Sequence, residues 1–142
     1  MVNLCARVAP SAAVAAIGIL IAFGPQPGSL FGVCEPGEMK MVCYYTAKAE
    51  LWIGLSVAAL GILSAAASLR GRGGVAAGIF ISAAVASALA AAVVLSIGIC
   101  GSQMMHCHDP ALPAPQAILA LAVIAALASA AGARLSVERR GD

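Results

Sequence analysis

The stretch VAAGIFISAAVASALAAAVVLSIGIC, residues 75–100, contains no charged side chain. A helix needs about 20 consecutive apolar residues to cross the hydrocarbon core of a bilayer, and this run is longer than that. It shows none of the period-two alternation expected of a barrel strand. The polar sequence Arg70-Gly-Arg-Gly-Gly74 precedes it, and Pro110, Pro113 and Pro115 follow it. We therefore predict a membrane-spanning helix over residues 75–100.

The rest of the chain has the same apolar character. Of its 142 residues, 62% are hydrophobic and 10% are charged, and the mean hydropathy is +1.00. A soluble domain carries about 25% charged residues, so too few polar side chains are present to cover a surface that faces water. Alanine is abundant, and small side chains let helices pack closely in lipid. We predict an all-α integral membrane four-helix bundle formed by one domain, residues 1–142, with helices over residues 8–23, 46–69, 75–100 and 116–135 and outer loops over 24–45 and 101–115.

The positive charges predict how the bundle is oriented. All six arginines lie near the chain ends or in the segment 70–74, whereas the two lysines, Lys40 and Lys48, lie elsewhere. Cytoplasmic loops carry an excess of Lys and Arg. Placing both termini and the 70–74 segment in the cytoplasm gives six positive charges inside and two outside. We predict a multi-pass protein of the cytoplasmic (inner) membrane with both termini cytoplasmic.

The first apolar segment also resembles a signal peptide in its position. No convincing A-x-A cleavage site follows it, so we expect this segment to remain in the protein as a helix. Cys5 precedes the apolar run, and we expect it to be a free cytoplasmic thiol, with an acylation site as the alternative.

Two segments of the chain share a cysteine pattern. The sequence Cys34-EPGEMKMV-Cys43 follows the first apolar segment, and Cys100-GSQMMH-Cys107 follows the third. Each reads as a cysteine, a short spacer and then Met-x-Cys, and another helix follows each one. We interpret the chain as two tandem helix–Cys-loop–helix repeats, related by an axis along the membrane normal. Both segments would then lie on the outer side of the membrane.

Disulfide bonds are the first interpretation of this pattern. The outer compartment is oxidising, and paired cysteines there usually form bonds. Four cysteines can pair in three ways, and their spacing in the sequence does not determine which pairing forms. A disulfide that closes a short loop stabilises a protein by about 2–4 kcal/mol. This interpretation predicts a non-enzymatic accessory or assembly subunit of a membrane complex, with an outer cap ordered by disulfides among Cys34, Cys43, Cys100 and Cys107.

A metal site is the second interpretation. Thioether and thiolate groups favour Cu(I), and His with Met can ligate haem iron. The spacing matches no standard zinc pattern. The alternative function is therefore metal handling at a copper or haem site on the outer face, with ligands drawn from Met41, Cys43, Met105, His106, Cys107 and His108.

Thiol–disulfide exchange is the third interpretation. Membrane disulfide oxidases also have four helices and outer cysteine pairs, but they carry a C-x-x-C pair, which this chain lacks. Cys43 lies near Lys40 and Lys48, and a nearby cation activates a thiol. No P-loop, nucleophile elbow or HExxH motif is present. These features favour a protein that is not an enzyme, and the net charge of +2 gives no reason to expect nucleic acid as a partner.

For the residues around the start of the second helix, we predict structural roles and not functional ones. Thr46 is predicted to cap the helix over residues 46–69. Glu50 is predicted to lie solvated at the membrane interface, where the positive helix end favours it. Tyr44, Tyr45 and Trp52 fit an aromatic belt at the outer interface. We expect no ionisable residue deep in any helix, and hence no proton relay.

The stretch MVCYYTAKAE, residues 41–50, together with the later Cys…Met-x-Cys, resembles domain-of-unknown-function family 4418, a family of small prokaryotic four-helix membrane proteins. Its members carry Met-Lys-Cys-His-Trp followed by Thr/Ala/Gly-Gln-Ala-Glu. Here Met41-Val42 is inserted after Met39-Lys40, and Tyr44-Tyr45 stands where His-Trp is usual, which weakens a metal site that uses that histidine. The resemblance implies a four-helix membrane fold without an established activity, and an accessory role beside ABC-type transporters.

Overall fold

The computed structural model describes residues 2–26, 42–97 and 114–138, with side-chain environments for 8–26, 44–96 and 116–138. These residues form four α-helices, α1 (Val2–Phe23), α2 (Val42–Leu69), α3 (Gly73–Ile97) and α4 (Ala114–Glu138). The described part of the chain contains no strand. The predicted all-α four-helix architecture is confirmed.

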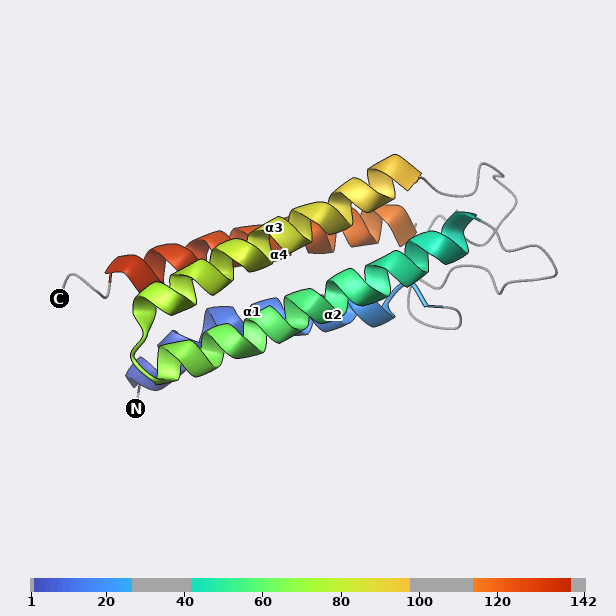
Figure 1. Ribbon diagram of the computed structural model, residues 1–142. Coiled ribbons are helices and arrows are strands. Elements are labelled where there is room, and N and C mark those ends of the chain that lie inside the picture. Colours follow the sequence, from blue (N-terminus) through green and yellow to red (C-terminus); the bar gives the residue numbers. More distant parts are fainter. Residues whose placement is uncertain (1, 27–41, 98–113, 139–142) are drawn as a thin grey trace.

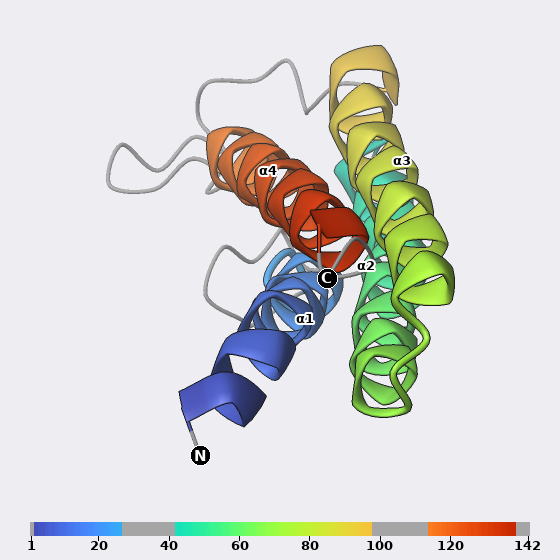
Figure 2. The same ribbon diagram turned by 90° about the vertical axis from the view of Figure 1, so that its left-hand side faces the viewer.

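The helices run alternately in opposite directions and form one bundle (Figure 1). α1 packs on α2, α2 on α3 and α3 on α4, and α4 closes the ring against α1. Figure 2 shows this ring along the bundle, with α4 between α1 and α3. Helices adjacent in sequence are therefore neighbours in space, as expected of an up-and-down bundle.

Large apolar side chains cover the outside of the bundle. Three helical segments are long and apolar enough to cross a membrane, namely Tyr44–Leu69, Gly73–Ser96 and Gln116–Glu138, and the apolar part of α1, Val8–Phe23, is shorter. A continuous apolar exterior of this kind suits lipid and not water. The protein is therefore a membrane protein. The side chains that are more than half exposed include Trp52, Ile62, Ile81, Leu89, Leu95 and Leu127.

All four helices begin earlier than predicted from the sequence, α3 and α4 by two residues each. α1 begins at Val2 and not at residue 8, so Pro10 lies within the helix and not in its opening turn. α2 begins at Val42 and not at residue 46, so the prediction that Thr46 caps this helix is wrong, and Thr46 is buried inside it. Apolar runs indicate which residues suit lipid, but helical hydrogen bonding continues beyond them.

Glycines let α1 and α2 approach backbone to backbone. A Cβ atom on Gly18 would lie 2.5 Å from the backbone nitrogen of Ala58, and one on Gly61 would lie 2.6 Å from the facing backbone of α1. A Cβ on Gly54 would overlap the backbone of Ala22. Close packing of small residues drives helix association in lipid, where the hydrophobic effect between helices is absent.

The contact between α3 and α4 is built differently, around one aromatic ring. Phe80 of α3 is 1% exposed, and a Cβ on Gly132 of α4 would lie 2.6 Å from its Cε1 atom. Phe80 packs with Val14, Val57 and Ala83, so residues of three helices meet around it. A second cluster, formed by Ile21, Ala90 and Ala122, joins α1, α3 and α4.

Residues 70–72 link α2 to α3. The Arg72 N–H donates to the Ala67 carbonyl at 3.0 Å, and the Gly71 N–H donates to the Ser68 carbonyl at 3.2 Å. Gly71 has a φ of 69°, a conformation that favours glycine, so α2 ends in a Schellman motif. The link then turns directly into α3, which confirms the break predicted at residues 70–74.

Candidate functional site

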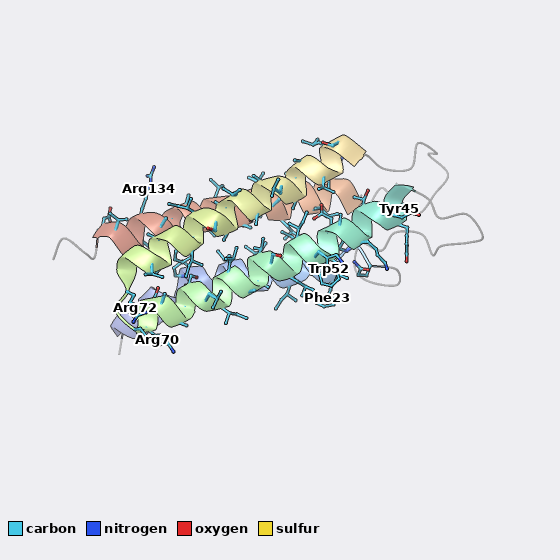
Figure 3. The ribbon with its side chains drawn as sticks, in the orientation of Figure 1. Phe23, Tyr45, Trp52, Arg70, Arg72 and Arg134 are labelled. Atoms are coloured by element: carbon cyan, nitrogen blue, oxygen red, sulfur yellow. The ribbon has the colours of Figure 1, made fainter. Side chains whose placement is uncertain are left out.

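The helix ends that border the two cysteine segments lie together. The last turn of α1, the first turn of α2, the last turn of α3 and the first turn of α4 are at the same end of the bundle (Figure 1). We call this the outer end. The opposite, inner end carries the start of α1, the 70–72 link and the last turn of α4, with Arg70, Arg72 and Arg134 (Figure 3).

Most of the predicted disulfide and metal residues lie outside the described residues. Only Cys43 falls within a described helix, in the first turn of α2, and its side chain is not described. Within the described ranges, no three His, Cys, Asp or Glu side chains are grouped to hold a metal ion. The disulfide, copper or haem, and thiol-exchange interpretations therefore stay predictions. The residues outside the described ranges are Cys34, Met41, Cys100, Met105, His106, Cys107 and His108.

Gln26 connects α1 to α2 just inside the outer end. Its side-chain amide donates to the carbonyl of Ala22 in α1 at 3.1 Å and to the carbonyl of Ala47 in α2 at 3.0 Å. Pro25 is fully buried and Ala47 is 2% exposed. The ends of the two helices are thus fixed against each other at the point where the first cysteine segment begins.

Glu50 lies in the bundle interior, one turn further along α2 than Ala47. Its side chain is 0% exposed, and neither carboxyl oxygen has a hydrogen-bond partner among the described residues. The prediction of a solvated interfacial position is wrong, because this ionisable side chain is enclosed by the bundle in the third turn of α2. An unpaired charge is costly to bury, and ionisable residues that face the interior of a membrane bundle mark functional sites.

The early start of α2 and the faces of the helix explain this burial. Glu50 is the ninth residue of α2, so it lies in the third turn and not in the first. It shares its face with Val57 and Ser64, at seven-residue spacing, and all three side chains are 0% exposed. Successive helical residues are about 100° apart, so Trp52, which is 68% exposed, lies on the opposite side. The positions of bulky apolar residues could therefore have indicated that Glu50 faces inward.

Aromatic side chains surround α2 near the outer end. Tyr45 and Trp52 are exposed and, like Phe23 of α1, lie on the outside of the bundle (Figure 3). The Tyr44 ring packs edge-on against Tyr45 at a centroid distance of 5.8 Å, and the Lys48 Nζ atom lies 5.5 Å from the Tyr44 ring centre. Amphipathic rings and a cation held over an aromatic face suit the boundary between lipid and water. This arrangement agrees with the predicted aromatic belt.

Comparison with known proteins places the chain in a family. The family model described as "Domain of unknown function (DUF4418)" matches residues 14–131. A search of curated proteins found no match, and a search of solved structures found none. The matched range runs from within α1 to within α4 and contains residues 41–50, on which the resemblance was based. Because the match spans far more than half of the chain, this protein belongs to the DUF4418 family.

Proposed function

We propose that this protein is a non-enzymatic subunit that crosses the cytoplasmic membrane four times and carries a disulfide-ordered cap at its outer end. Its role is that of an accessory or assembly subunit of a membrane complex, for example an ABC-type transporter. The observation that carries the proposal is the position of the helix ends. The chain leaves and re-enters the bundle twice at the outer end. Cys34 lies between α1 and α2 in the sequence and Cys43 follows it in the first turn of α2, whereas Cys100 and Cys107 both lie between α3 and α4.

A face of α3 supports the accessory role. Gly74, Gly78 and Ser82 are spaced four residues apart, and all three are exposed. A Cβ placed on Gly78 would have nothing within 4 Å. In lipid, such small-xxx-small faces allow another helix to approach closely. The glycines of α1 and α2 are already used within the bundle, whereas this face of α3 is available to a helix of another subunit.

Thiol counting tests the disulfide cap. The chain contains five cysteines. Protein purified with free thiols blocked, then denatured without reductant, should have only Cys5 modified, and reduction should expose four more thiols. The variant Cys5→Ser is the matched control and should show none before reduction and four after it. Four outer thiols that react without reduction would remove the disulfide cap from the proposal.

Site-specific crosslinking tests the accessory role. A photoreactive amino acid at position 82 in native membranes should crosslink to one membrane protein, because this position lies on the small face of α3. The same reagent at Val123, which is 55% exposed on α4, serves as the control and should contact lipid. Equal crosslinking at the two positions, or none at position 82, would contradict a partner helix on α3.

A further inference from the structure

We propose that Glu50 is a proton-binding site in the interior of the bundle, a property that goes beyond the accessory role. Its carboxyl group is 0% exposed and has no hydrogen-bond donor among the described residues. The group is one turn inside the Gln26 bridge, so it lies near the outer end and not at the bundle centre.

The surroundings of Glu50 offer little to a negative charge. The side chains buried near the outer ends of the four helices are apolar except for Thr46, which is buried one turn before Glu50 on α2. Two interior serines closer to the middle and inner end bond to their own helices: Ser87 donates to the Ala83 carbonyl and Ser64 to the Gly61 carbonyl, each at 2.8 Å. The hydroxyls of Ser11 and Ser129 are buried without a hydrogen-bond partner among the described residues. The buried apolar residues near the outer end are Ile21, Pro25, Ala47, Val94 and Ile118.

Charged groups on the packed helices are also remote from Glu50 or turned away from it. Residues 8–26 of α1 and the whole of α3 contain no charged side chain. In α4 the described charges are Arg134 and Glu138, both at the inner end. On α2, Lys48 is exposed and lies over the Tyr44 ring. Within the described residues, no cation is therefore in place to neutralise a Glu50 carboxylate.

The chemistry of the site selects a proton over a metal ion. A metal cation of the calcium or magnesium type needs six or more oxygen ligands, whereas the described residues supply one carboxyl group here. A proton needs a single carboxyl oxygen and makes the group neutral.

Infrared spectroscopy tests the bound proton directly. The difference spectrum between wild type and Glu50→Gln, in lipid vesicles at neutral pH, should contain the C=O stretching band of a protonated carboxylic acid, with the usual shift in D2O. The matched control is Glu138→Gln, since Glu138 is exposed and should contribute no such band. Absence of the band from the wild-type spectrum would overturn the proposal.

Chemical labelling of the wild type gives a second readout that needs no variant to fold. Dicyclohexylcarbodiimide is apolar and reacts with a protonated carboxyl: the acid adds across a C=N bond, its proton moves to nitrogen, and an acyl shift yields an N-acylurea with no leaving group. Mass spectrometry should locate the adduct on Glu50, with less labelling as the pH is raised and no effect of added NaCl or KCl. Protection by either salt would indicate a metal-cation site, and an unlabelled Glu50 would indicate a paired carboxylate; both results contradict a proton site.

Discussion

At the scale of single residues, two chemically identical glycines have opposite roles. Gly54 lies where the backbones of α1 and α2 touch, and a Cβ there would overlap Ala22. Gly78 lies on the exposed face of α3, where a Cβ would meet nothing within 4 Å. The first glycine is required by close packing within the bundle, whereas no contact within the bundle requires the second, which there only adds conformational freedom to its helix.

We expect alanine at these two positions to change stability in opposite directions. Gly54→Ala should lower the free energy of unfolding by about 1–3 kcal/mol, because extra atoms in a packed interface force the backbones apart. Gly78→Ala should raise it by about 0.5–1 kcal/mol, because alanine loses less conformational entropy in a helix. Unfolding in mixed detergent micelles, followed by circular dichroism, measures both values. A stability at or above wild type for Gly54→Ala would contradict the backbone contact.

Residue-scale features were the least predictable from the sequence. The abundance of glycine and alanine indicated close packing, but their abundance does not reveal which glycine faces which helix. Glu50 was misplaced because the predicted helix began four residues too late, which put a third-turn residue in the first turn. The sequence singled out the cysteine segments as the candidate site, whereas the burial of the Glu50 carboxyl group was not predicted.

At the scale of elements, α2 has one face for lipid and another for the interior. Glu50, Val57 and Ser64 point inward, whereas Trp52 and Ile62 are more than 60% exposed. The average hydropathy of the helix conceals this division, since both faces contain apolar residues. Mean hydropathy therefore predicted that the helix exists, whereas its orientation is indicated only by the spacing of bulky residues such as Trp52 and is fixed by packing against α1 and α3.

Trp52 is the single tryptophan of the chain, so its fluorescence reports the environment of the outward face of α2. In vesicles we expect its fluorescence to be quenched by lipids with bromine atoms near the headgroups more than by lipids brominated deep in the tails, because Trp52 lies near the outer end. The double variant W52F/F80W is the control: the new tryptophan replaces a buried ring and should escape lipid quenching. Strong quenching of Trp52 by aqueous acrylamide, with none by brominated lipid, would place this face in water.

At the scale of the whole molecule, the number of helices and their arrangement in one bundle followed from the sequence alone. Four apolar segments that must each cross the bilayer in alternating direction leave few other packings in lipid. The order of the helices around the ring did not follow from composition, since it depends on the glycine contacts between α1 and α2 and on Phe80 beside Gly132.

Both described chain ends reach the inner end, together with the 70–72 link (Figure 1). Four of the six arginines belong to these described segments, and the other two, Arg139 and Arg140, directly follow α4 in the sequence, so we expect the inner end to face the cytoplasm. A fluorescent protein fused after residue 142 should fluoresce in cells, and an alkaline phosphatase fused there should be inactive. The same reporters inserted in the predicted outer loop 24–45 should give the reverse result. An active C-terminal phosphatase would invert the orientation and place the cysteine segments in the reducing cytoplasm.

The turn from α2 to α3 has a consequence for how deeply the protein sits in the bilayer. Only three residues separate the two helices, and the hydrogen bonds of the Schellman motif restrict the conformation of this connection. Arg70 and Arg72 are exposed there, so their guanidinium groups are held at nearly equal height, where lipid phosphates can bind both. The short link couples the vertical positions of α2 and α3, so neither helix can shift along the membrane normal without moving the other. In a bilayer of different thickness, the two helices must therefore change their tilt together.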